Sequence, residues 1–138
     1  MRCGRMRIEA SFICDDIRLE QGNKFSLMGI YDLGLLLPQI PASVPKLCLF
    51  QKWIDVPRNA TLSVELRGMA LPGPVRLEPV RTQGAPGGED PAPANILVSF
   101  AMVNIVAEGE LEFLTYWEGD STPAHTHRVR ISKLVPTG

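Results

Sequence analysis

Alternation of apolar and polar residues with a period of two is the feature that most restricts how this chain can fold. Residues Thr61 to Arg67 alternate without exception, since three apolar residues lie between polar ones. Successive side chains of a β-strand point to opposite faces, so this pattern predicts a strand with one buried face. Residues Arg7 to Cys14 alternate in the same way, except at Ile13, and place Phe12 on the predicted core face.

The segment from Cys14 to Tyr31 predicts a β-hairpin. Two extended arms flank Gly22-Asn23, and glycine and asparagine adopt the positive φ that tight hairpin turns require. The second arm, Phe25 to Tyr31, is apolar on both faces, as is the stretch Leu47 to Ile54. We expect these two strands to be covered on both sides or to lie at a dimer contact.

The rest of the chain continues the all-β pattern. Further predicted strands are 33–37, 47–54, 75–77, 95–102, 110–117 and 126–134. No segment has a sustained helical period, and twelve glycines and twelve prolines suit a protein with many turns. About eight short strands with short connections predict an antiparallel two-sheet β-sandwich with little or no helix.

We predict a single domain. The 138 residues are enough to bury a core, so residues 7–135 are assigned to the sandwich and residues 1–6 to an N-terminal extension. Met6 lies where the alternation begins, so either Met1 or Met6 is compatible with the start of the protein. Thr82 to Ala94 has only alanine as an apolar residue and is rich in Gly and Pro, which predicts a mobile loop.

Composition restricts the partners and the compartment. The formal net charge is −1 and no two Lys or Arg residues are adjacent, which argues against nucleic acids and anionic membranes as partners. The longest mostly apolar stretch, Ile96 to Ala107, is too short to span a membrane. The cysteines Cys3, Cys14 and Cys48 form no C-x-x-C pair, which favours free thiols in a cytoplasmic protein. No phosphate loop or dinucleotide fingerprint is present, so no cofactor is expected.

The hairpin carries a recognisable signature. The order Cys-Asp-Asp-Ile-Arg from Cys14, followed by Gly-Asn-Lys-x-Ser-Leu-x-Gly-x-Tyr ending at Tyr31, resembles a family of short bacterial proteins with no assigned function. The resemblance extends more loosely through Pro45-Lys46-Leu47 to the Glu108-Gly109 turn. It implies a bacterial, cytoplasmic, single-domain β protein and carries over no catalytic residue.

The charged part of the hairpin is the first candidate binding site. Asp15, Asp16 and Glu20 offer carboxylate ligands for Ca²⁺ or Mg²⁺, and Arg18 lies among them. Consecutive residues of a strand point to opposite faces, so Asp15 and Asp16 converge only where the strand bends. The alternative, which we favour, is structural: one Asp accepts backbone N–H bonds at a bend while Arg18 pairs with a neighbour.

Two further positions are candidate sites. His125 and His127 share one strand face, which suits zinc, but no third ligand has a recognisable spacing to them, so we expect exposed polar side chains and no metal. Tyr116 points away from the core face of Trp117 and, together with Leu114, leaves apolar surface outside the core. Such surface suggests a contact with a partner or with a second copy.

Surplus apolar surface and the lack of an assembled catalytic set favour a non-enzymatic interaction module. It would act through contacts with an unknown protein partner or as a homo-oligomer. The alternative is a small ligand-binding protein or enzyme that uses the hairpin from Asp15 to Glu20, with or without a divalent cation. The sequence leaves the biological process and the partner's identity open.

Overall fold

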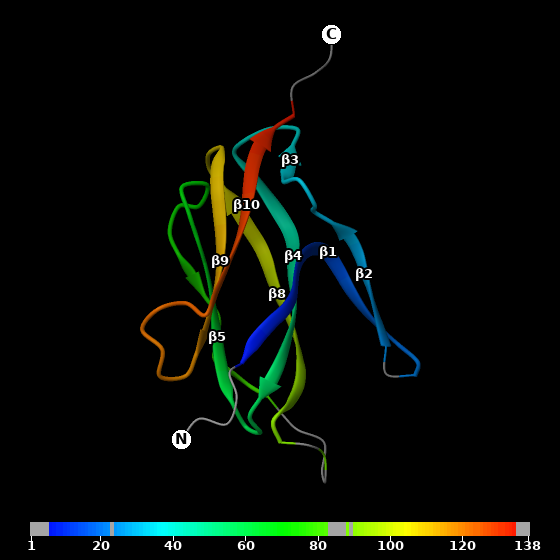
Figure 1. The fold of residues 1–138 in the computed structure, drawn as a ribbon. Helices are drawn as coiled ribbons and strands as arrows, with labels where there is room; N and C mark the ends of the chain where they lie inside the picture. Colours follow the sequence, from blue (N-terminus) through cyan, green and yellow to red (C-terminus); the bar gives the residue numbers. More distant parts are fainter. Residues whose placement is uncertain (1–5, 23, 83–87, 89, 135–138) are drawn as a thin grey trace.

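The computed structural model describes residues 6–22, 24–82, 88 and 90–134. These residues form two β-sheets and the loops that connect their strands (Figure 1). The strands are β1 Arg7–Glu20, β2 Lys24–Ile30, β3 Leu35–Leu37, β4 Ala42–Val56, β5 Thr61–Arg67, β6 Val75–Arg76, β7 Val80–Arg81, β8 Ala92–Ile105, β9 Gly109–Trp117 and β10 His125–Lys133. One sheet has the order β2-β1-β4-β8, and the other has the order β3-β10-β9-β5-β6, with β7 also beside β5. This architecture confirms the predicted all-β sandwich.

The strand pattern differs from the prediction in two details. The described residues form ten strands rather than about eight, and one of them, β7, pairs with β5 where no strand was predicted. One pair is parallel rather than antiparallel, with Leu35 of β3 opposite Ile131 of β10. Parallel neighbours need a long connection, and here most of the domain lies between the two strands. No helix that could cross a membrane occurs in the described part of the chain.

The core lies between the two inner faces. Leu62, Val64 and Leu66 are all buried, which confirms the alternation predicted for β5. Phe113 of β9 and Ile131 of β10 are buried as well. Each inward face supplies every second residue of its strands, so the core is built from alternating positions of both sheets.

The prediction that Phe12 lies in this core is wrong. The register between β1 and β4 shifts between Ile8 and Ala10. Such a bulge adds one residue to a strand and turns every later side chain to the opposite face. Ile13, the exception in the sequence pattern, is therefore the buried residue, whereas Phe12 is 39% exposed on the outer face of the sheet.

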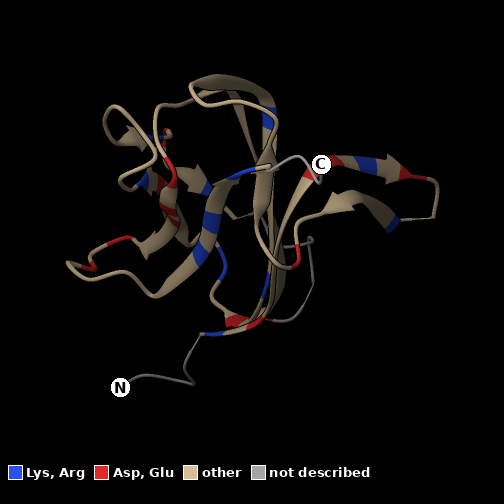
Figure 2. Ribbon diagram, turned by 90° about the horizontal axis from the view of Figure 1, so that it is seen from above, with Lys and Arg blue, Asp and Glu red and all other residues tan. Residues whose placement is uncertain are grey.

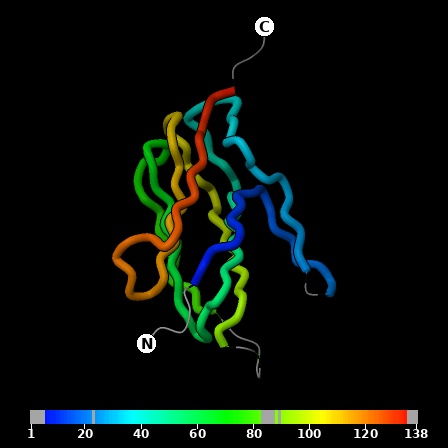
Figure 3. Tube along the Cα trace, in the orientation of Figure 1, coloured from blue at the N-terminus to red at the C-terminus, as the bar shows by residue number. Residues whose placement is uncertain are grey.

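Halfway along its length, β1 bends and runs back beside the sandwich (Figures 1 and 3). Its first half pairs with β4 and its second half pairs with β2, which confirms the predicted hairpin. Glu20 pairs with Lys24, so three residues rather than two separate the paired ends. Asn23, one of the two predicted turn residues, lies outside the described residues.

The hairpin covers part of the outer face of β4. The ring of Phe25 in β2 contacts that of Phe50 in β4, with centroids 4.9 Å apart, and the ring of Phe12 lies 6.4 Å from Phe50 on the same face. Phe50 is buried as a result, although it points away from the main core. This second, smaller cluster explains why β4 is apolar on both faces.

Part of the predicted loop Thr82 to Ala94, residues 83–87 and 89, lies outside the described residues. The described ends of this loop are joined to the neighbouring strands. Thr82 donates to the carbonyl of Ala60 through both its N–H and its hydroxyl, at 2.7 and 3.1 Å, and β8 already begins at Ala92. Met6, assigned to the extension, packs against the core.

Candidate functional site

Asp15 lies at the bend of β1 and contacts β2. Its carboxylate accepts a hydrogen bond from the hydroxyl of Tyr31. Gly29 has a φ of +68°, and a Cβ there would overlap the Asp15 carboxylate, so this position requires glycine on two grounds. Burial and the bond to Asp15 raise the pKa of Tyr31, which keeps the phenol protonated as a donor. These three signature residues therefore fix the start of the hairpin.

Asp16 has different partners from its neighbour. Its carboxylate lies 2.7 Å from Nζ of Lys46 on β4 and 3.7 Å from Nε of Arg18, and it accepts the N–H of Ile17 at 3.0 Å. The hydrogen bond from Lys46 lowers the pKa of Asp16 below its ordinary value. Asp16 thus ties the bend to the sandwich, whereas Asp15 ties it to the hairpin.

Each of the three hairpin carboxylates contacts another side chain of the protein. Glu20 accepts a hydrogen bond from the hydroxyl of Ser26 across the hairpin. Charges of both signs alternate along β1 at this end (Figure 2). Within the residues described, no three His, Cys, Asp or Glu side chains gather as metal ligands. This arrangement favours the structural interpretation of the hairpin charges over the cation site.

Two buried thiols lie behind the bend. Cys14 and Cys48 are opposite each other on β1 and β4, and neither is exposed. Cys14 Sγ donates to the carbonyl of Asp16 at 3.5 Å, and Cys48 Sγ donates to that of Asp15 at 3.7 Å. Burial raises the pKa of Cys14, so the thiol stays protonated and poorly reactive.

The sequence analysis missed a polar cluster at one open edge of the sandwich. His125 and His127 lie on the inward face of β10 and are half-buried, which corrects the prediction of exposed side chains. His127 Nδ1 and the hydroxyl of Ser11 are hydrogen-bonded at 2.7 Å. An open cleft of about 410 Å³ lies beside them, between residues 8–11 of β1 and 125–128 of β10. Burial lowers the pKa of both imidazoles.

Gln51 connects this cluster to the interior. It is fully buried, and its carbonyl oxygen accepts two hydrogen bonds of 3.0 Å, from Trp53 Nε1 and from the hydroxyl of Thr115. Its amide donates to Ser11 at 3.4 Å. The network joins the two sheets and satisfies buried donors, which is a structural role. Ser11 and His127 are 116 positions apart, so no local sequence pattern could reveal their contact.

The predicted surface around Tyr116 is only partly present. The Tyr116 ring stacks under the guanidinium of Arg76, whose central carbon lies 5.6 Å from the ring centroid. Leu114, predicted to be exposed beside it, is buried, with Glu65 and Thr126 as its neighbours on the two adjacent strands. This face therefore offers less apolar surface than the sequence suggested.

A different apolar surface occurs at β8, the last strand of the four-stranded sheet. No residue from Asn95 to Ala107 is charged. Every second N–H and C=O of an edge strand points away from its only neighbour. In the described part of the chain no strand pairs with β8 on the side away from β4, and just beyond it Val106 donates to the carbonyl of Ala70 at 2.7 Å.

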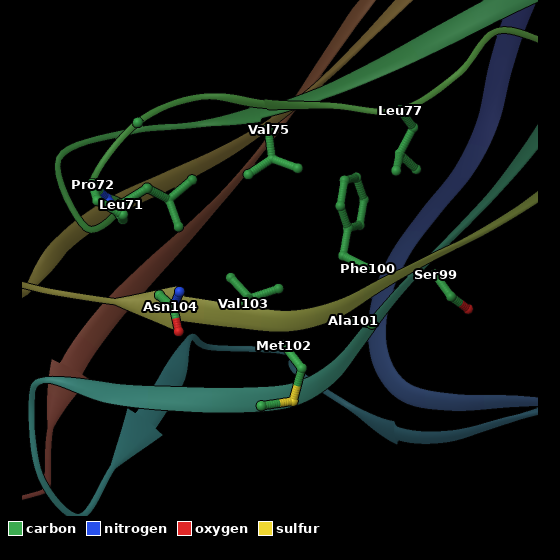
Figure 4. Close-up of a pocket in the computed structure, with 11 residues that line it drawn as sticks. Leu71, Pro72, Val75, Leu77, Ser99, Phe100, Ala101, Met102, Val103 and Asn104 are labelled. Atoms are coloured by element: carbon green, nitrogen blue, oxygen red, sulfur yellow. The ribbon is translucent and has the colours of Figure 1, made fainter.

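An apolar groove of about 180 Å³ lies along this edge. Phe100 and Val103 of β8 point into it from one side, and Val75 and Leu77 point into it from the other (Figure 4). Met102 points away from the groove and is 61% exposed. The groove therefore lies beside the free edge of β8. Its sequence signal is the long uncharged stretch, but the sequence does not reveal which strand lies at an edge.

Comparisons with known proteins identify a family of unknown function. A model described as "Family of unknown function (DUF6941)" matches residues 9–130, so the chain belongs to this family, in agreement with the resemblance of the hairpin signature to an uncharacterised family. Among solved structures, a β-glucosidase from Listeria innocua in complex with glucose is 12% identical over 92% of this chain, with a TM-score of 0.38. The chain corresponds to 16% of that protein's chain. No curated protein matches.

Proposed function

We propose that this member of the DUF6941 family is a non-enzymatic protein-binding module that binds an extended segment along the free edge of β8. The observation that carries the proposal is the uncharged edge beside the apolar groove. A segment paired with β8 extends the β2-β1-β4-β8 sheet by one strand, with main-chain hydrogen bonds as the source of affinity. Alternate side chains of the segment point toward the groove, which selects for apolar residues there.

The edge of β8 differs from the other open strand edges in its lack of charge. Proteins protect exposed edges from unwanted pairing with charged side chains or with very short strands. Lys24 lies on the edge strand β2, Arg7 and Glu9 lie on the open first half of β1, and Arg128 lies on the open first half of β10. The long strand β8 has no such protection, which supports a partner at this edge.

The carboxylate site of the hairpin has less support. Asp15, Asp16 and Glu20 are each engaged by another side chain of the protein. We further propose a reducing, cytoplasmic setting, because Cys14 and Cys48 lie opposite each other as free thiols.

Selection from a display library of short random peptides tests the proposal. The chain is immobilised at low density, so that its edges are free. We expect enriched peptides to be uncharged and to alternate apolar with small polar residues. Ala101→Lys, at an exposed position of β8, should weaken their binding by about tenfold or more.

Leu19→Lys is the matched control, because Leu19 is 81% exposed on the hairpin and the variant carries the same added charge. It should bind the selected peptides as the parent does. Failure to enrich any peptide, or equal binding of the peptides to Ala101→Lys and the parent, would overturn the proposal.

A further inference from the structure

We infer that the segment bound at β8 is β8 of a second copy of this chain, paired antiparallel about a two-fold axis at Ser99. The inference rests on the proposed function and adds the identity of the partner. It predicts that the four-stranded sheets of two copies join into one continuous sheet. Such an interface is isologous, so each copy contributes the same residues to it.

The chemistry of the edge favours a second copy. The edge selects an extended, uncharged strand with alternating apolar residues, and β8 itself is such a strand, with Ile96, Val98 and Phe100 on one face. Like charges directly opposite each other destabilise a strand pair. Two copies of β8 place no charges against each other, because residues 95–107 contain none. The edges of β1 and β10 carry charged residues and lack this property.

The backbone geometry restricts the position of the axis. In a regular strand, residues that share a face also direct their N–H and C=O groups to the same side. Ile96, Val98 and Phe100 point inward, and exposed Val106 directs its N–H away from β4, toward Ala70. The outward residues of the regular stretch, 95, 97, 99 and 101, therefore present their backbone groups to the free edge.

The regular stretch ends just after these residues. Met102 has a φ of +51°, which interrupts the extended backbone. We place the axis at Ser99, where Leu97 lies opposite Ala101 of the second copy and Ser99 lies opposite itself. Leu97 is 40% exposed in the single chain, and the small side chain of alanine leaves room for it on the outer face.

Charge substitutions at Ser99 test both the partner and the axis. Ser99 is exposed, so either charge is compatible with the folded chain. Size-exclusion chromatography with light scattering should give the parent twice the 15.2 kDa mass of one chain. Ser99→Lys and Ser99→Glu alone should each shift the protein to the monomer mass, because the two identical charges are opposed at the axis. An equimolar mixture of the two variants should recover the dimer.

Circular dichroism spectra establish that the variants are folded, and Ala101→Lys replaces either variant that is not. Leu19→Lys should remain dimeric. A monomeric parent overturns the second copy as partner, but peptides that bind β8 of that monomer would leave the proposed function intact. The inference is also overturned if both Ser99 variants remain dimeric. It is overturned likewise if the equimolar mixture of the two variants stays monomeric. A monomeric parent that also binds no peptide would overturn the proposed function as well.

Discussion

Replacement of Gln51 should destabilise the fold more than its small change in volume suggests. Gln51→Met keeps the length of the side chain but removes the oxygen that accepts hydrogen bonds from Trp53 Nε1 and the Thr115 hydroxyl. Both donors are buried between the sheets, where water cannot replace the lost acceptor. The variant also loses the amide that donates to Ser11.

The loss of stability follows from the two buried donors that are left without an acceptor. A buried polar group without a partner costs about 1–3 kcal/mol, so two such groups give about 2–6 kcal/mol. We expect about 3 kcal/mol, since the Thr115 hydroxyl can rotate toward a carbonyl of its own strand. Thr115→Val in the Gln51→Met background removes one unpaired donor and should raise the free energy of unfolding by about 1 kcal/mol. The same Thr115→Val change in the parent should lower stability, because there it removes a satisfied hydrogen bond.

Urea unfolding followed by circular dichroism measures these differences, and an unchanged slope establishes that the unfolded reference is the same. The four proteins form a double-mutant cycle that isolates the coupling between residues 51 and 115. A loss below about 1 kcal/mol for Gln51→Met would refute the reasoning, because it would fall in the range of ordinary surface changes. Additive effects of the two substitutions would refute the shared hydrogen bond.

Three other predictions concern particular positions. Phe113→Ala should cost about 3–5 kcal/mol and Phe12→Ala clearly less, because only Phe113 is fully buried; equal losses in urea unfolding would contradict the bulge in β1. Burial, together with the neighbouring imidazole, holds the pKa of His127 below its ordinary value of 6.5, so the unfolded chain binds the proton first and stability should fall as the pH drops below 6.5. His127→Phe should flatten this dependence of the urea midpoint on pH. An unchanged profile would exclude His127 as the source of the dependence. Gly29→Ala should cost at least about 1 kcal/mol in thermal melts, and more than Gly22→Ala, which meets no neighbouring atom; equal losses would contradict the packing at Gly29.

The sequence predicted strands well wherever one face alone is buried. Thr61 to Arg67 forms β5 with the predicted bounds, because its alternation leaves a single arrangement with the apolar face inward. It failed at Phe12, because a bulge two residues earlier changes the face of every following side chain and has no signal in the pattern. Leu114 was placed outside the core for a related reason, since strand alternation does not show what the neighbouring strands cover.

The candidate sites show the same limit. The hairpin signature could be recognised from the sequence, and so could the possibility that its charges are structural. The contact of Ser11 with His127 and the position of β8 at an edge depend on topology, which brings together segments far apart in the chain. The stretch Ile96 to Ala107 was visible as an apolar segment, but only the sheet order gives it an open side.

The pairing of β3 with β10 determines when this protein can fold during its synthesis. Leu35 lies opposite Ile131, so the six-stranded sheet cannot close until nearly all of the domain has left the ribosome. The β1–β2 hairpin needs only neighbouring residues and can form much earlier. Until β10 emerges, the strands already made present unpaired edges to the cell. A pause in translation before residue 125 therefore prolongs the period in which the nascent chain is open to aggregation and to chaperones.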